Sequence, residues 1–149
     1  MIRELTLPEL PDVVATAGPA FFTEGRLPGR YNAASYLHFW RGLLTSGRGV
    51  IFQLSTSAGE AMGWIGGMLF DDPLTGDLVV MESFWFAYPK HRGLGAIKLI
   101  KRLEQWARDH RAVRLVMACL NAINFEIMGD LYTRAGFQPT ETFYLKELK

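Results

Sequence analysis

The stretch Pro89-Lys90-His91-Arg92-Gly93-Leu94-Gly95-Ala96-Ile97 joins a long apolar segment to a segment with helical periodicity. A glycine-rich turn at the start of a helix presents backbone N–H groups without intrahelical partners, together with the positive end of the helix dipole. Gly93 and Gly95 let the backbone approach an anion closely, and Arg92 adds a charged fork of donors. The turn therefore predicts a phosphate-binding loop, and a plain strand-to-helix connection is the alternative.

Two common nucleotide-binding motifs do not match this turn. The Walker loop requires G-x-x-x-x-G-K-[S/T], which the sequence lacks. The dinucleotide fingerprint requires a third glycine three residues after Gly95, where Lys98 stands. The phosphate ligand must therefore be identified from the context of the turn.

The residues around the turn predict one α/β (α+β) domain with a mixed sheet, because helical and strand periodicities follow one another along the chain. The expected helices begin near Leu10 and after Asn121, and two more cover residues 32–45 and 95–108. The expected strands are residues 49–55, 61–70, 78–86, 113–119 and 137–145. The expected loops are residues 18–30, 71–77 and 87–95, and Gly136 is expected to end the last helix in a left-handed conformation.

The composition limits the functional classes. The chain has 149 residues, of which 49% are hydrophobic, and this fits a single domain over residues 1–149. A net charge of only +1 argues against a nucleic-acid partner, and no apolar run approaches the ~20 residues that would span a membrane. One cysteine, Cys119, excludes an internal disulfide framework, and the histidines show no metal-ligand spacing. We therefore expect a cytoplasmic protein without a signal peptide, a membrane partner or a metal.

Glu82 is an acidic residue in an otherwise apolar segment. A buried carboxylate needs a partner or a water-filled cleft. With a strand period of two, Glu82 is expected to share a face with Phe84 and Phe86. It is either a functional group in a cleft or one half of a structural ion pair.

Two motifs resemble those of the GNAT superfamily of N-acetyltransferases. The family's coenzyme A motif, [R/Q]-x-x-G-x-[G/A], is similar to Arg92-Gly93-Leu94-Gly95-Ala96-Ile97, with Ile97 where the family has Gly or Ala. Further along, Leu131-Tyr132-Thr133-Arg134-Ala135-Gly136-Phe137 resembles the family's L-Y-x-x-x-G-F signature. The two motifs stand in the family's order with the expected elements between them, so the resemblance covers essentially the whole chain.

The resemblance implies a GNAT-like acyl-CoA N-acyltransferase fold, with a mixed, mostly antiparallel central sheet and helices on both faces. Acetyl-CoA would be the co-substrate, in a V-shaped opening between the strand ending at Phe86 and the strand Val113–Cys119. Its pantetheine would pair with main chain near Ser83 to Ala87, which includes Phe84, Trp85, Phe86 and Ala87. Its pyrophosphate would contact Arg92, Gly93, Leu94, Gly95, Ala96 and Ile97.

The same resemblance implies direct attack of an amine on the thioester in a ternary complex. Tyr132 would protonate the departing thiolate, since a phenol pKa of about 10 lies close to a thiol pKa of about 8.5. A tyrosine buried in the core is the alternative for Tyr132. Glu82 would accept the amine proton, directly or through water. Asn121 would bind pantetheine or, as its spacing from Tyr132 favours, cap the next helix.

The predicted acceptor is a primary amine of a small molecule or peptide, and a homodimer is left open. The loop between the first two helices often shapes the acceptor pocket in this family, but its residues do not identify the acceptor. These residues include Phe21, Phe22, Glu24, Arg26 and Arg30. Two alternatives remain: a catalytically silent GNAT-fold protein that binds acyl-CoA or regulates a partner, and an enzyme that uses a different acyl-CoA or a nucleotide.

Overall fold

The computed structural model describes residues 1–148, which form two compact units: Met1–Ala118 and the part that begins at Cys119. The strands are β1 (Ile2–Glu4), β2 (Gly49–Ser55), β3 (Ala61–Asp71), β4 (Leu78–Ala87) and β5 (Arg114–Val116). The helices are α1 (Leu10–Glu24), α2 (Ala33–Thr45), α3 (Leu94–Asp109) and α4 (Phe125–Arg134), with short 3-10 helices η1 (Leu7–Glu9) and η2 (Pro89–His91). All of these elements except α4 belong to the first unit.

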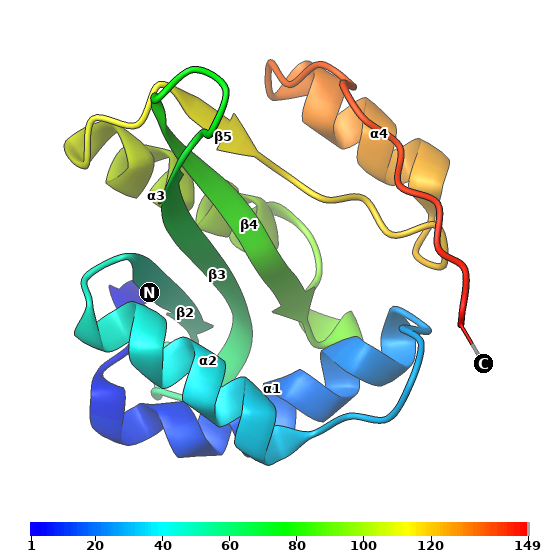
Figure 1. Ribbon diagram of the computed structural model, residues 1–149. Helices are drawn as coiled ribbons and strands as arrows, with labels where there is room; N and C mark the ends of the chain where they lie inside the picture. Colours follow the sequence, from blue (N-terminus) through cyan, green and yellow to red (C-terminus); the bar gives the residue numbers. More distant parts are fainter. Residues whose placement is uncertain (149) are drawn as a thin grey trace. The chain divides into compact units, whose positions relative to one another are not determined.

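The first unit is built on a five-stranded sheet with the strand order β1-β2-β3-β4-β5 (Figure 1). The first four strands are antiparallel neighbours, and β5 pairs with β4 in parallel, which confirms the predicted mixed, mostly antiparallel sheet. The first strand, β1, was not predicted. Its three residues are too few to show a periodicity, and the strand forms because β2 supplies a ladder from Ile2↔Leu54 to Glu4↔Phe52.

Helices cover both faces of this sheet, as predicted, with α1 and α2 on one face and α3 on the other (Figure 1). Two consecutive glycines in β3 permit the close packing. A Cβ atom on Gly66 would lie 2.6 Å from the Trp40 ring of α2, and one on Gly67 would lie 2.5 Å from Leu103 of α3. A side chain at either position would push a helix away from the sheet.

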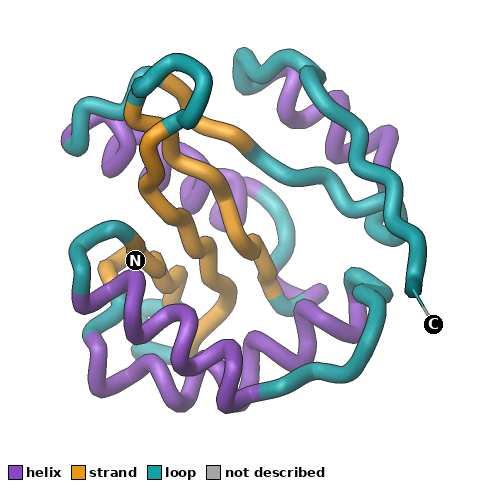
Figure 2. Tube along the Cα trace, viewed as in Figure 1, coloured by secondary structure: helices purple, strands orange, loops and turns teal. Residues whose placement is uncertain are grey.

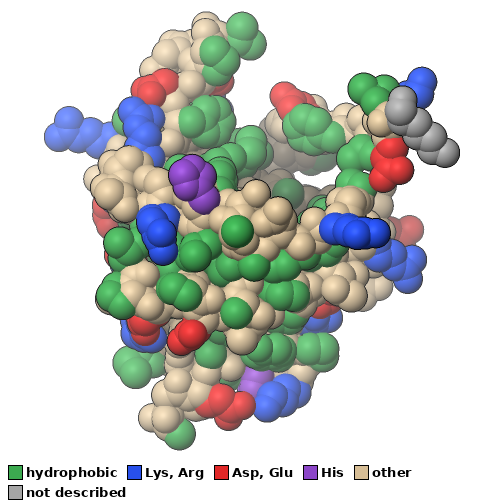
Figure 3. Space-filling model, turned by 60° about the horizontal axis from the view of Figure 1, so that its bottom comes forward, with side chains coloured by type: hydrophobic (Ala, Val, Ile, Leu, Met, Phe, Trp, Pro, Cys, Tyr) green, Lys and Arg blue, Asp and Glu red, His purple; other side chains and the backbone are tan. Residues whose placement is uncertain are grey.

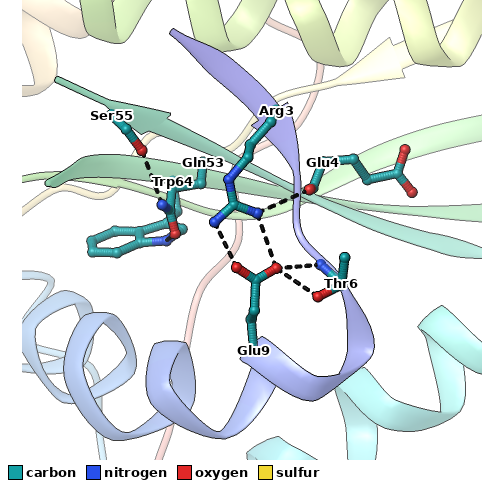
Figure 4. A network of polar contacts seen from close by, with 7 residues as sticks. All are labelled: Arg3, Glu4, Thr6, Glu9, Gln53, Ser55 and Trp64. Atoms are coloured by element: carbon teal, nitrogen blue, oxygen red, sulfur yellow. Dashed lines mark hydrogen bonds and ion pairs between the residues drawn. The ribbon is translucent and has the colours of Figure 1, made fainter. Parts of the chain in front are cut away.

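A buried polar network crosses β2 and β3 among the apolar side chains. Trp64 Nε1 donates to Gln53 Oε1 at 3.0 Å, and Gln53 Nε2 donates to Ser55 Oγ at 3.0 Å (Figure 4). All three residues are more than nine-tenths buried. The glutamine therefore satisfies an indole N–H that is shielded from water.

The start of α1 lies at Leu10, as expected, and a capping contact precedes it. Glu9 Oε2 accepts a hydrogen bond from the Thr6 N–H at 2.8 Å (Figure 4). The same carboxylate forms an exposed ion pair with Arg3 at 2.6 Å. The contact with Arg3, followed by the hydrogen bonds from Thr6, lowers the pKa of Glu9 to about 2.

The end of α1 differs from the prediction, because the helix continues to Glu24 through residues that were expected to form a loop. Pro19 lies inside the helix, where a proline lacks a backbone donor and crowds the preceding turn, so contacts with the rest of the fold must offset this cost. Beyond Pro19, Phe21 packs edge to face on Phe84 of β4, with 6.0 Å between the ring centroids. This tertiary contact keeps the last turns of α1 on the sheet.

The segments after α3 also differ from the prediction. The expected strand 113–119 is a strand only over Arg114–Val116. Residues 137–148 contain neither helix nor strand and appear as loop in Figure 2, so the expected strand 137–145 is wrong. An alternating pattern forms a strand only where a neighbour supplies the ladder, and Phe143 is 85% exposed. Gly136 has a φ of 92°, which confirms the predicted left-handed helix end.

Within residues 1–148, no helix is both long and apolar enough to cross a membrane. Within the same range, no three His, Cys, Asp or Glu side chains are grouped so that they could hold a metal ion. Figure 3 shows charged side chains of both signs scattered over the face turned toward the viewer, rather than gathered by sign.

Candidate active site

The connection from β4 to α3 forms the predicted glycine turn. Gly93 is the N-cap residue of α3 and has a φ of 140°, a conformation that favours glycine. The first hydrogen bond of the helix runs from the Ile97 N–H to the Gly93 carbonyl at 3.2 Å. The N–H groups of Leu94, Gly95 and Ala96 precede it and are the donors that the turn offers to an anion. Ile97 was also expected to bind the pyrophosphate, but it uses its N–H within the helix.

Gly95 packs α3 against the sheet. A Cβ atom at this position would lie 3.3 Å from a Leu54 methyl group of β2. The absence of a side chain on Gly95 therefore lets the first turn of α3 lie close to the sheet, in addition to any role toward an anion. At Gly93, by contrast, a Cβ atom would meet nothing within 4 Å among the described residues.

Arg92 lies directly before this turn and is held by two partners in the first unit. Its Nε donates to the Ala87 carbonyl at 3.0 Å, and its Nη2 lies 2.6 Å from the Glu24 carboxylate at the end of α1. The third nitrogen, Nη1, forms no hydrogen bond with residues 1–148. The carbonyl of Ala87, expected among the pantetheine contacts, is therefore already engaged by Arg92.

The strands β4 and β5 part halfway along β4. Their parallel register runs from Val79↔Arg114 to Met81↔Val116, whereas β4 continues to Ala87. Beyond Met81, β3 is the strand that pairs with β4 within the described residues. Beyond Met81, the edge of β4 that faced β5 thus has no β5 partner, and this is where the V-shaped opening is predicted.

A β-bulge lies next to this point. Gly66 pairs with Phe84 and Gly67 pairs with Glu82, so Ser83 is an extra residue in β4. The strict period of two, on which Glu82 was expected to share a face with Phe84, therefore does not hold across Ser83.

Glu82 is 6% exposed, and its Oε2 accepts a hydrogen bond from the Ala118 N–H at 3.0 Å. No Lys or Arg among residues 1–148 forms an ion pair with it. Burial raises the pKa of Glu82 to about 7, and the hydrogen bond from Ala118 opposes part of this rise. Such a carboxyl group gains and loses its proton near neutral pH, as a general base must.

Phe84 and Phe86 direct their side chains into the core rather than toward a ligand. Both belong to the apolar cluster beneath α1 and α2, and the Phe84 ring lies 5.6 Å from that of Trp40. Their main chain is the part that a donor molecule could contact, which is the contact that was predicted. Trp85, between them, is half-buried.

The sequence model of the acetyltransferase (GNAT) family matches residues 13–137, which is most of the chain. The chain belongs to the GNAT family. No curated protein sequence matches it significantly.

Solved structures share the GNAT fold over nearly the whole chain. A predicted acetyltransferase with acetyl-CoA from Clostridium acetobutylicum is 16% identical, with a TM-score of 0.80 over 99% of this chain and 95% of that chain. A ribosomal-protein-alanine N-acetyltransferase from Brucella melitensis biovar Abortus 2308 is 19% identical, with a TM-score of 0.70 over 99% of each chain. An aminoglycoside antibiotic 6'-N-acetyltransferase from Acinetobacter haemolyticus is 20% identical, with a TM-score of 0.71 over 100% of this chain and 98% of that chain. At these identities, the likeness concerns the fold.

Two predicted site residues of this GNAT chain lie in its second unit. Tyr132, on α4, is 9% exposed, and its ring lies 5.6 Å from that of Phe137. Asn121 lies in a turn and does not cap α4, because the N-cap residue is Asn124 in a left-handed conformation. The capping prediction for Asn121 is therefore wrong, and the roles of Tyr132 and Asn121 toward a GNAT donor stay predictions.

Glu24, the ion-pair partner of Arg92, lies far from the turn in the sequence. Its position carries a signal, because it is the last residue of α1, where the helix dipole disfavours a negative charge and favours a nearby cation. The sequence does not identify that cation as Arg92, since 68 positions separate the two residues.

A cavity of about 560 Å³ lies elsewhere in the first unit, beside the start of α1. Its walls include Arg3 and Lys90, which form ion pairs with Glu9 and Glu60. The cavity is lined neither by Glu82 nor by the first residues of α3, so it is separate from the candidate GNAT site.

Proposed function

We propose that this chain is an acetyl-CoA-dependent N-acetyltransferase of the cytoplasm, which acetylates a primary amine of a small molecule or peptide and acts as one catalytic domain. The observation that carries the proposal is the placement of two groups along β4. The buried Glu82 lies where β4 leaves β5, and the free N–H groups at the start of α3 follow the end of the same strand. One strand thus connects a group that can take a proton to a turn that can hold a phosphate.

The donor would be held by the turn and by the released edge of β4. The N–H groups of Leu94, Gly95 and Ala96 and the positive end of the α3 dipole suit the pyrophosphate, and Arg92 adds a charged donor. The pantetheine amides would pair with main chain beyond Ser83, as an added strand does. The fold already orients these N–H groups and Arg92, so their chemistry suits the diphosphate of coenzyme A.

Acetyl-CoA supplies an activated thioester, from which the acetyl group passes to the amine nitrogen as the carbon–sulfur bond breaks. At neutral pH an alkylamine, with a pKa of about 10, is mostly protonated and must lose a proton before it can attack. Glu82, with a pKa of about 7, would take that proton directly or through water. Tyr132 would give a proton to the departing thiolate. Holding both substrates together would supply much of the acceleration.

Calorimetric titration with acetyl-CoA, followed by a thiol-release assay, tests the proposal. The acceptor panel should include a simple alkylamine, an aminoglycoside and a peptide with a free amino terminus. Binding of acetyl-CoA together with thiol release that depends on one of these amines supports the proposal. Binding without release from any amine would favour the silent acyl-CoA-binding protein, and the absence of binding would overturn the proposed donor.

A further inference from the structure

We propose that Glu24 is a positioning residue for the donor: it holds Arg92 so that the free Nη1 of the guanidinium is presented to the pyrophosphate. This inference rests on the proposed function, since it assumes that coenzyme A binds at the start of α3. It assigns a task in donor binding to a residue of α1, an element that the coenzyme A motif does not include.

The geometry of Arg92 carries the proposal. The guanidinium is planar, so fixing two of its nitrogens also fixes the direction of the third. Nε is held by the Ala87 carbonyl at 3.0 Å, and Nη2 is held by Glu24 at 2.6 Å. The nitrogen without a partner among residues 1–148, Nη1, is therefore an oriented donor rather than the end of a freely rotating side chain.

This oriented donor lies beside the free N–H groups at the start of α3. Arg92 immediately precedes Gly93, the N-cap residue of α3. The N–H groups of Leu94, Gly95 and Ala96 follow directly, ahead of the first intrahelical hydrogen bond. Backbone donors and one oriented cation thus belong to the same short turn, which is the combination that an anionic diphosphate favours.

The Glu24–Arg92 pair is poorly explained as a source of stability. The two side chains are 28% and 44% exposed, and surface pairs of this kind contribute little to folding. Glu24 also places a negative charge at the end of a helix, where the dipole opposes it. Orientation of Arg92 would explain why an acidic residue stands at this helix end. A side chain that is already ordered loses less conformational entropy when it binds a ligand.

The sign of the effect separates positioning from simple electrostatics. Glu24→Ala removes a negative charge near the expected diphosphate, so charge alone predicts tighter coenzyme A binding. Positioning predicts the opposite, because Arg92 would lose its second anchor. We expect the dissociation constant for coenzyme A to rise about 2- to 10-fold, the range for ordering one long side chain. Glu24→Gln keeps an oxygen that can accept from Nη2 and should restore most of the affinity.

The matched control is Glu60→Ala. It removes the same charge from another exposed ion pair, that of Glu60 with Lys90, two residues before Arg92. Calorimetry on the purified full chain should show unchanged coenzyme A affinity for this variant. In an Arg92→Ala background, Glu24→Ala should cause no further loss of affinity, since the two residues position the donor through one contact.

A donor without the diphosphate completes the test. With acetyl-CoA, Glu24→Ala should raise KM and leave kcat within about twofold. With S-acetylpantetheine, which lacks the diphosphate, kcat/KM should equal that of the wild type, whereas structural damage would lower it with both donors. If the wild type binds coenzyme A and Glu24→Ala binds it equally well or more tightly, the positioning role is wrong and the proposed function stands. If the wild type binds no coenzyme A, both are wrong.

Discussion

The carboxylate of Glu82 accepts a hydrogen bond from the backbone N–H of Ala118, with 3.0 Å between the oxygen and the nitrogen. Glu82 directly follows Met81, whose pairing with Val116 is the last rung between β4 and β5. A side chain thus continues the connection between the two segments beyond the end of their ladder. The same carboxyl group is the buried acid for which we propose a catalytic role, so its protonation can be tested in both stability and rate.

Glu82→Gln should reduce the pH dependence of stability between about pH 4.5 and 7. Burial raises the pKa of Glu82 from 4.5 to about 7, so over this range the folded protein keeps a proton that the unfolded chain releases. The stability from this protonated group is complete below about pH 4.5 and is lost as the pH rises through 7. Glutamine cannot ionise. The fall in Tm from pH 5 to pH 8 should therefore be smaller in the variant, and an equal fall in both proteins would contradict the buried acid.

The pH–rate profile of the same variant tests the proposed base. Wild-type kcat/KM for the acceptor should rise as the pH passes about 7, where Glu82 ionises. Glu82→Gln should lack this inflection and lose about 10²–10⁴-fold near pH 8, a usual contribution of general acid–base catalysis. The deficit should shrink toward pH ~10, where the free amine forms without help. A variant that keeps the wild-type inflection would remove Glu82 from the proton transfer.

Leu94→Glu should weaken coenzyme A binding without destabilising the protein. Leu94 is the first residue of α3 and is 80% exposed, so its side chain contributes little to packing. A negative charge in the first turn favours the helix but repels a phosphate at the same place. Leu94→Gln introduces a side chain of nearly the same shape as glutamate but without the charge, and this variant should bind coenzyme A like the wild type. Calorimetry measures the coenzyme A affinity of each variant, and Tm measures its stability. Equal coenzyme A affinities of Leu94→Glu and Leu94→Gln would place the pyrophosphate elsewhere.

Tyr132→Phe should lower turnover by about 10²–10⁴-fold and change acetyl-CoA affinity little, because it removes a proton donor and keeps the buried ring. Tyr144→Phe makes the same chemical change at a residue that is 94% exposed and should behave as the wild type. Single-turnover thiol release with a saturating amine measures the effect. Full turnover in the Tyr132 variant, with chemistry limiting the rate, would leave this tyrosine a structural role only.

Gln53→Leu should destabilise the protein by about 1–3 kcal/mol, because the buried indole N–H of Trp64 and the hydroxyl of Ser55 lose their partner. Adding Trp64→Phe removes the orphaned donor, so the double variant should lose less free energy of unfolding than the sum of the two single variants. Denaturant unfolding of the single and double variants measures both free energies. Strict additivity of the two changes would show that the network is not coupled.

The features that the sequence determined by itself are those encoded by neighbouring residues. Helical spacing after Asn32 predicted α2, and its cap is present, since Asn32 Oδ1 accepts from the Ser35 N–H at 3.0 Å. Apolar runs predicted β2, β3 and β4, and the change of period at Gly95 predicted α3. The glycine turn and the tyrosine motif together led to the GNAT family. Each of these signals spans less than about 15 residues, so local propensity and periodicity were sufficient.

Tertiary structure alone decided the features that depend on distant partners. The extra residue Ser83 changes the phase of β4 because β3 sets the register. The pKa of Glu82 reflects burial by segments that are remote in sequence, and the anchor of Arg92 comes from Glu24 on α1. The alternating residues 137–145 form no strand, because periodicity records a preference and a ladder needs a second strand. Charges, registers and pairings are properties of neighbours in space, which a local pattern does not contain.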